Sequence, residues 1–225
     1  TKAIVLVTPN NPTGAEYPAG LVLAFYVLAR DRGIALIVDE TYRDFHSQSG
    51  APHALFADPD WDRTLIHLYS FSKAYRMPGY RVGAMLTSPA RLRQAEKVLD
   101  TVTICPSQIG QIGALWGLKH LAPWLTEQRA EILARRAAVA EVFARLDGWR
   151  LLVSGAYFAY VSHPDPRPAD QLAPALVDEA GILALPGTMV RPPDDPAGAQ
   201  ELRLAFSNID REGIAELGRR LATLG

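Results

Sequence analysis

Ser70-Phe71-Ser72-Lys73, followed by Gly79-Tyr80-Arg81-Val82-Gly83, is the stretch on which the predicted fold depends. The apolar residues 64–69 lead directly into it. A run of branched and aromatic residues closed by small polar ones indicates a buried strand that ends in a loop. In an open α/β sheet, ligands bind just outside the carboxyl ends of the strands. We therefore expect Lys73 and Arg81 to border a ligand site.

Two further apolar runs upstream extend this strand into a sheet. Residues 3–8 and 34–38 are the expected strands. Between them, residues 18–32 have a helical pattern that places Leu21, Phe25 and Leu28 on one face, and Gly33 ends the helix. A strand, a helix and a strand in this order predict a parallel sheet.

Downstream, the pattern is first helical and then mixed. Ser88 is expected to cap a helix that begins at Pro89, and helices are expected over residues 107–119 and 123–146. The remaining expected elements are strands at 150–153, 157–162, 182–185 and 202–206, a helix at 170–179, and a helix from Asp210 to Leu224. The predicted fold class is therefore α/β: part of a larger, mostly parallel sheet flanked by helices in residues 1–122, a long helix at 123–148, and a small α+β domain at 149–225.

Composition narrows the possible partners. The 225 residues carry a formal net charge of −1 without a long basic run, and no apolar segment is long enough to span a bilayer, so neither nucleic acid nor a membrane is an expected partner. The single cysteine, Cys105, is expected in the core and excludes an internal disulfide, which favours a cytoplasmic location. The five histidines lack metal-ligand spacing, and no metal site is expected.

The chain starts at Thr1 and at once enters an apolar strand of the kind found in the centre of a sheet. We therefore expect it to be the carboxyl-terminal part of a longer protein.

The side chains after the third strand suit one particular cofactor. The hydroxyls of Ser70 and Ser72 and the guanidinium of Arg81 are suitable donors to a phosphate. The amine of Lys73 could form an imine with a carbonyl on the same molecule. Pyridoxal 5'-phosphate (PLP) has both groups. Taken alone, however, Lys73 could be an ordinary surface lysine.

Four other polar residues follow strands or lie in the last part of the chain, and each has a structural alternative. Asp39 suits the pyridine nitrogen of PLP, because a facing carboxylate keeps that nitrogen protonated, but it could be a helix cap. Asn11 and Tyr42 suit the phenolic oxygen, although Asn11 could be a turn residue and Tyr42 a core residue. Arg203 suits a substrate carboxylate, although it could be an exposed residue on an edge strand.

The ordered motifs resemble those of one enzyme family. N-N-P-T-G, D-E-T-Y, S-F-S-K with G-Y-R-V-G, and L-R-L-A-F follow one another as in the class I/II aminotransferases, PLP enzymes of fold type I. The resemblance implies that Lys73 is the catalytic Schiff-base lysine and proton carrier, that Arg203 binds the substrate carboxylate, and that Val82 opens an antiparallel strand. It also assigns cofactor-binding roles to Asn11, Asp39, Tyr42, Lys73 and Arg81, with Asn11 near the substrate as well. Ser70 and Ser72 complete the expected cofactor-binding residues as phosphate donors.

The expected activity is transfer of an amino group between an amino acid and a 2-oxo acid, in a homodimer by resemblance. Family members have an additional amino-terminal part that supplies a phosphate-binding loop and an aromatic residue on the cofactor ring. Without these, activity of this chain alone is in doubt. The alternatives are another PLP reaction on the same scaffold, such as a carbon–sulfur lyase or a synthase, a PLP-sensing effector domain of a transcription regulator, or an inert remnant.

Overall fold

The computed structural model describes residues 1–223, which form two compact units. The first unit consists of Thr1–Pro9 and Glu16–Arg129. The second consists of Asn10–Ala15 together with the residues from Ala130 onward. Each unit therefore contains a segment from the start of the chain, and helix α4 (Ala122–Phe143) contributes residues to both.

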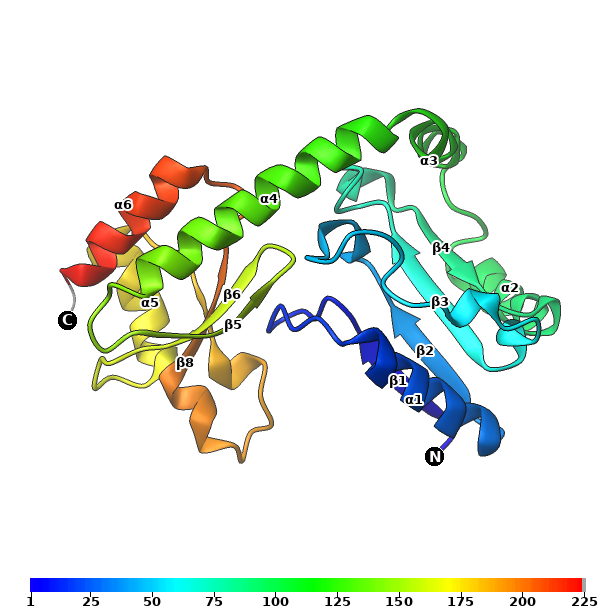
Figure 1. Cartoon of the computed structure of the whole chain (residues 1–225), viewed down its shortest axis with the longest axis horizontal. Helices are drawn as coiled ribbons and strands as arrows, with labels where there is room; N and C mark the ends of the chain where they lie inside the picture. Colours follow the sequence, from blue (N-terminus) through cyan, green and yellow to red (C-terminus); the bar gives the residue numbers. More distant parts are fainter. Residues whose placement is uncertain (224–225) are drawn as a thin grey trace. The chain divides into compact units, whose positions relative to one another are not determined.

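The first unit has a four-stranded sheet in the order β1-β2-β3-β4, whose strands lie side by side in Figure 1. Strands β1 (Ala3–Val7), β2 (Ala35–Asp39) and β3 (Leu65–Ser70) are parallel, and β4 (Gly83–Leu86) runs antiparallel to β3. The predicted parallel sheet and the antiparallel fourth strand are both confirmed. Because the three parallel strands end at one edge, the residues that follow them are brought together there.

Helix α1 (Ala19–Asp31) packs on the sheet through a face different from the predicted one. Val22, Tyr26 and Ala29 are buried against Leu36 and other strand residues in one core cluster. The face on which the sequence pattern places Leu21, Phe25 and Leu28 is not the buried one: Leu21 and Leu28 are 43% and 42% exposed, while Phe25 is half-buried against the cluster. The helix is apolar on several sides, so its spacing alone does not select the buried face.

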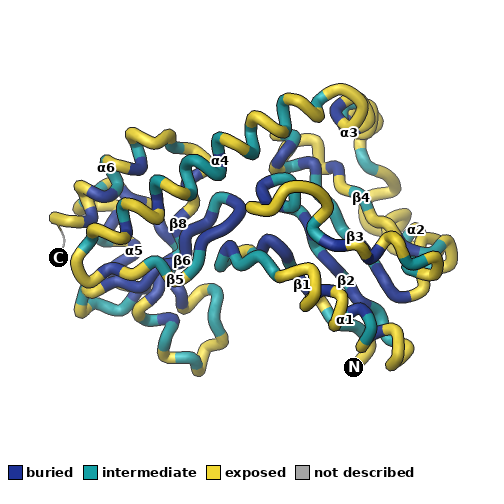
Figure 2. Tube along the Cα trace, in the orientation of Figure 1, coloured by how far each residue is buried: buried dark blue, intermediate teal, exposed yellow. Residues whose placement is uncertain are grey.

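The rest of the first unit consists of short turns and two helices. Three 3₁₀ turns connect β2 to β3: η1 (Arg43–Phe45), η2 (Leu55–Ala57) and η3 (Trp61–Arg63). A fourth, η4 (Pro78–Tyr80), precedes β4. Helix α2 (Pro89–Val102) begins as predicted, with the Arg91 N–H donating to Ser88 Oγ, and Figure 2 shows it exposed along most of its length. Helix α3 (Gln108–His120) follows, and Cys105 between them is exposed, contrary to the prediction of a core position.

The second unit has an antiparallel sheet in the order β5-β6-β8-β7. Its elements are β5 (Arg150–Gly155), β6 (Phe158–Ser162), α5 (Ala169–Ala180), β7 (Leu185–Pro186), η5 (Gly187–Met189), η6 (Pro196–Gln200), β8 (Glu201–Ala205) and α6 (Arg211–Ala222). Buried side chains on β6, β8, α5 and α6, among them Val161, Leu172 and Leu202, form its interior. This antiparallel sheet with helices agrees with the predicted small α+β region.

Two predicted elements are shorter in the structure than expected. The strand expected at residues 182–185 is reduced to β7, because the chain reaches β8 only at Leu185, and Pro186 has no N–H to continue the ladder. Helix α4 ends at Phe143 instead of Leu146. Helix α6 starts after Asp210 as predicted, while Leu224, its predicted last residue, lies outside the described residues. The division into functional domains at 1–122, 123–148 and 149–225 stays a prediction.

Candidate active site

Asp39 and Ser70 end neighbouring parallel strands at the same edge of the first sheet. Asp39 pairs with Val7 of β1 on one side and with Leu68 of β3 on the other. The Asp39 side chain is half-buried, and its Oδ1 accepts hydrogen bonds from the N–H of Thr41 at 2.9 Å and from its hydroxyl at 2.7 Å. Within residues 1–223 nothing donates to Oδ2. Thr41 thus holds the carboxylate by one oxygen and leaves the other available to a cation.

Lys73 and Tyr42 lie close together after these two strands. The Lys73 Nζ is 6.0 Å from the centroid of the Tyr42 ring. The Tyr42 ring is buried, with 5% of its surface exposed, whereas Lys73 is exposed and its amine has no hydrogen-bond partner in the described part of the chain. An amine beside a buried aromatic ring, without an acidic partner, is available to react with a carbonyl compound.

The three predicted phosphate donors are also neighbours. Ser70 Oγ accepts the Ser72 N–H at 3.2 Å, and Arg81 Nη1 lies 3.5 Å from Ser72 Oγ. Arg81 has φ 53°, in the left-handed region, and its Nη1 also donates to the Pro78 carbonyl at 2.8 Å. The turn therefore directs one guanidinium and two hydroxyls to the same region, a donor set typical of phosphate sites.

Asn11 and Arg203 are brought together within the second unit. Arg203 Nη1 donates to Asn11 Oδ1 at 3.0 Å, and the guanidinium lies 5.0 Å from the centre of the Phe158 ring. The Arg203 Nε is buried and has no hydrogen-bond partner among the described residues. A buried donor without a partner is costly, which favours a site whose anion completes the set.

The turn at Asn10 explains why Asn11, and not Asn10, faces outward. Asn10 Oδ1 accepts from the Thr13 N–H and hydroxyl at 3.2 and 2.8 Å, and its carbonyl accepts from the Gly14 N–H at 2.7 Å. Gly14 has φ +80°, and a Cβ there would lie 2.4 Å from the Gly155 nitrogen. The side-chain oxygen of Asn10 is therefore occupied by hydrogen bonds within the turn. Gly14 has no Cβ and so permits the close approach of the turn to β5 that holds Asn11 in place.

A buried ionic cluster on Glu40 lies next to Asp39 in sequence and was not predicted. Glu40 is fully buried, with His67 Nε2 2.7 Å from its Oε2, His53 Nε2 3.3 Å from its Oε1, and Arg43 Nη1 3.2 Å from Oε2. Burial raises the pKa of Glu40, but the close contact with His53, the hydrogen bond with His67 and the charge of Arg43 outweigh it and bring the pKa to about 2. Two histidines far apart in sequence give no local signal for such a cluster.

The site residues thus form two groups, one in each unit. Lys73, Tyr42, Asp39, Ser70, Ser72 and Arg81 gather at one edge of the first sheet, and Asn11 contacts Arg203 in the second unit. Sequence reasoning missed Thr41 and Phe158 as their supports. The spacing of two residues from Asp39 to Thr41 was a usable signal, because it is typical of an Asx turn.

Among residues 1–223 no three His, Cys, Asp or Glu side chains gather as a metal ion requires. No helix in that part of the chain has the length and apolarity needed to cross a bilayer.

Comparisons with known proteins agree with this geometry. The sequence model described as "Aminotransferase class I and II" matches residues 1–221. The chain is 25% identical to the aspartate aminotransferase of Sulfurisphaera tokodaii over 96% of this chain and 55% of that protein. It is 34% identical to histidinol-phosphate aminotransferase 1 of Bradyrhizobium diazoefficiens over 81% of this chain and 49% of that protein. Among solved structures, aspartate aminotransferase from Thermus thermophilus with maleate is 25% identical, with a TM-score of 0.86 over 100% of this chain and 57% of that one. The chain spans about half the length of the curated relatives it matches.

Proposed function

The chain belongs to the aminotransferase class I and II family, and on that basis we propose that the protein is an aminotransferase that moves an amino group between an amino acid and a 2-oxo acid. Enzymes of this family depend on PLP and have the α/β fold seen in this chain. The observation that carries the proposal is the unpartnered amine of Lys73 beside the buried Tyr42 ring, with Ser70, Ser72 and Arg81 nearby. The names of the relatives favour an aminotransferase over a lyase or a regulator.

The residues of the first unit fit the cofactor by the chemistry of their donor set. Lys73 supplies an amine for attachment, and Arg81 with two serine hydroxyls supplies cationic and neutral donors for a phosphate. The free Oδ2 of Asp39 suits a protonated pyridine nitrogen, because a facing carboxylate raises the pKa of that nitrogen. The hydroxyl of Tyr42 suits the phenolic oxygen, a role that Asn11 would share. When bound, PLP supplies an electron sink that withdraws charge from the substrate α-carbon.

The chain's own residues would then bind the substrate and move one proton. Arg203 would hold the α-carboxylate of the substrate, with its buried and unpartnered Nε completing a second hydrogen bond. Lys73 Nζ, once free, would take the proton from the substrate α-carbon as a general base and hand that proton on to the cofactor as a general acid. Thr41 would keep the Asp39 carboxylate in one orientation while this happens. The donor amino acid would exchange its amino group for an oxygen from water and leave as a 2-oxo acid, and an acceptor 2-oxo acid would take up the amino group, with release of water, in the reverse sequence.

Binding of PLP to the protein expressed from its whole gene is the first test. We expect an absorbance band near about 420 nm that borohydride makes permanent, with Lys73 as the modified residue. Lys73→Ala should abolish the permanent attachment. Release of ammonia from a single amino acid, with no acceptor needed, would contradict transamination and support a lyase.

Arg203→Lys tests the carboxylate site. A lysine cannot make the bidentate contact, so kcat/KM for amino acids should fall roughly 10- to 100-fold, mainly through KM. Arg211→Lys is the matched control, because Arg211 is exposed at the start of α6. Equal activity of the two variants would remove Arg203 from the substrate site.

We also propose that the protein is a homodimer located in the cytoplasm. Helix α3 supports the first point, since Ile109, Ile112 and Trp116 are 72%, 61% and 56% exposed, and apolar patches of this kind mark interaction surfaces. The exposed free thiol of Cys105 supports a reducing compartment. Sedimentation equilibrium tests the homodimer, and a monomer would refute it. Cell fractionation tests the cytoplasmic location.

A further inference from the structure

A partly buried hydrogen bond connects the turn after Tyr42 with strand β3, which leads into the Lys73 loop. The hydroxyl of Tyr69 donates to Asp44 Oδ2 at 2.6 Å. Asp44 lies two positions after Tyr42, and Tyr69 lies four positions before Lys73. Neither has a place in the proposed chemistry, so the contact needs an explanation of its own.

The surroundings of Tyr69 stabilise this hydrogen bond. Tyr69 packs edge-to-face on Phe71, with ring centroids 5.2 Å apart, and lies 6.3 Å from the ring of Tyr75. Burial and the neighbouring Asp44 carboxylate both raise the pKa of Tyr69, so its hydroxyl keeps the proton that it donates. A bond to a charged acceptor in a poorly hydrated place is stronger than an exposed one.

The Asp44 side of the contact fixes the turn that follows Tyr42. The Phe45 N–H donates to the Tyr42 carbonyl at 3.0 Å, which closes the 3₁₀ turn η1 around Asp44. One residue earlier, the Arg43 N–H donates to the Glu40 carbonyl at 3.0 Å, and its guanidinium pairs with the Glu40 carboxylate. The turn is therefore tied to β2 through Arg43 and to β3 through Asp44.

Tyr69 lies in β3, and the loop that carries Lys73 follows directly after this strand. The Phe71 N–H donates to the Val82 carbonyl at 3.2 Å, the Met77 N–H donates to the Phe71 carbonyl at 3.2 Å, and the Arg76 N–H donates to the Lys73 carbonyl at 3.1 Å. These bonds hold the Lys73 loop on the end of β3. In addition to β2–β3 pairing, the Tyr69–Asp44 bond is thus a direct side-chain hydrogen bond between the strand that leads into the Lys73 loop and the Tyr42 turn.

We propose that Asp44 and Tyr69 are positioning residues that hold the Tyr42 ring beside the Lys73 amine and so set the affinity for PLP. The last part of this inference rests on the proposed function. The first part, the ordering of the Tyr42 turn, does not. Loss of the bond should leave the sheet intact but loosen η1, because the turn would lose its side-chain hydrogen bond to β3 while it keeps the Arg43–Glu40 pair and the Arg129 hydrogen bonds to the carbonyls of His46 and Ser47.

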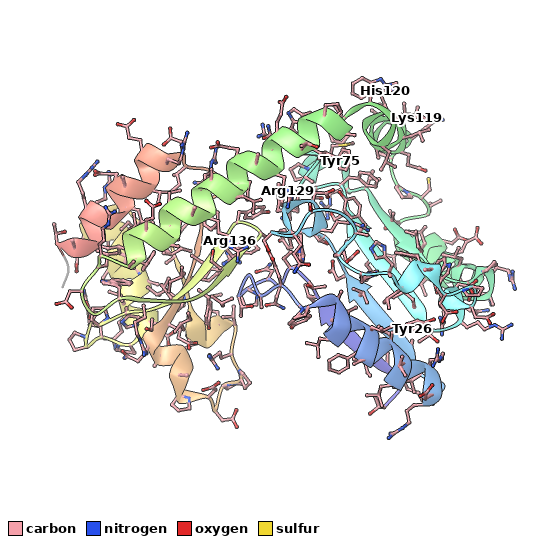
Figure 3. All side chains as sticks on the ribbon, in the orientation of Figure 1. Tyr26, Tyr75, Lys119, His120, Arg129 and Arg136 are labelled. Carbon is pink, nitrogen blue, oxygen red and sulfur yellow. The ribbon has the colours of Figure 1, made fainter. Side chains whose placement is uncertain are left out.

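Tyr69→Phe is the central variant, and Tyr26→Phe is its matched control. Tyr26, labelled in Figure 3, is a buried tyrosine on α1 whose hydroxyl donates to Asp58 Oδ2 at 2.9 Å. Each substitution removes one phenolic hydrogen bond to a carboxylate. A merely structural role would affect both variants alike.

Two measurements separate positioning from stability. Without added PLP, hydrogen exchange of the Phe45 and His46 amides should become about tenfold faster in Tyr69→Phe and stay unchanged in Tyr26→Phe. In titrations with PLP, the dissociation constant should rise about tenfold in Tyr69→Phe only. Asp44→Asn retains an acceptor oxygen and should restore near-normal values, whereas Asp44→Ala should match Tyr69→Phe. The double variant Tyr69→Phe/Asp44→Ala should be no worse than either single change.

Equal effects of Tyr69→Phe and Tyr26→Phe on both readouts would overturn the inference, and so would additive effects of the two changes in the double variant. If the wild-type protein binds no PLP, the proposed function fails. Amide exchange then decides the inference alone: unchanged exchange at residues 45 and 46 refutes it, and faster exchange supports the positioning of the turn.

Discussion

Glu40→Gln should lower the free energy of unfolding by about 3 kcal/mol at neutral pH, and the loss should disappear in acid. The substitution keeps the size of the side chain but removes the buried negative charge that His53, His67 and Arg43 surround. Removing one partner of a buried charge pair typically costs about 3–5 kcal/mol, because the other partner is left uncompensated.

The magnitude follows from the pKa of Glu40. Burial raises that pKa, but the close contact with His53, the hydrogen bond with His67 and the charge of Arg43 outweigh burial, so the ordinary value of 4.5 falls to about 2. One pKa unit corresponds to about 1.36 kcal/mol, and the difference therefore amounts to about 3 kcal/mol. Since the folded-state pKa is the lower one, this stability is present above pH 4.5 and is lost as the pH falls towards about 2.

Urea unfolding of both proteins between pH 7 and pH 3 measures the effect. The fluorescence of Trp61 is a local probe, because its ring packs edge-to-face on Phe56, which also contacts His67. Glu96→Gln, on the exposed face of α2, is the control and should change the free energy of unfolding by less than about 0.5 kcal/mol. A loss for Glu40→Gln that is the same at pH 7 and pH 3, or below about 1 kcal/mol at pH 7, would refute the reasoning.

Three further changes probe the two units separately. Gly14→Ala places a methyl group 2.4 Å from the Gly155 nitrogen and should destabilise the second unit by about 1–3 kcal/mol, measured by thermal unfolding. Leu36→Ala removes a fully buried side chain from the core of the first unit and should cost about 2–5 kcal/mol in urea unfolding; a cost below about 1 kcal/mol would show that this core is loosely packed. Asp210→Ala removes the side chain that accepts the Gly213 N–H at 2.8 Å and should cost about 1 kcal/mol, with faster amide exchange at the start of α6.

The sheet of the first unit was predictable because its strands are continuous apolar runs, each closed by turn or polar residues. Residues 34–38 and 64–69 show this pattern, and β2 and β3 follow it to within two residues. The buried face of α1 was not predictable, because Leu21 and Val22 are equally apolar and only packing on Leu36 distinguishes them. Propensity likewise could not show that Pro186 limits β7 to two residues.

Some contacts in the candidate site were predictable from the sequence, and others were not. Ser70, Ser72 and Arg81 are close in sequence, so their proximity in space follows from one local turn. The contact between Asn11 and Arg203 spans 192 positions, and no local rule predicts it. Residue types and order were enough to choose these side chains. Their partners, such as Phe158 under Arg203 and Tyr69 on Asp44, depend on how distant strands pack.

The membership of Asn10–Ala15 in the second unit has a consequence for synthesis on the ribosome. At about 5–20 residues per second, the ribosome delivers Arg203 roughly 10–40 s after Asn11, over the 192 positions between them. During that interval the early segment is tethered to the first unit and its partners on β5 and β8 do not yet exist. A gene cut at residue 130 would therefore yield a second unit without its earliest piece, with Arg203 lacking Asn11 and Gly155 lacking Gly14.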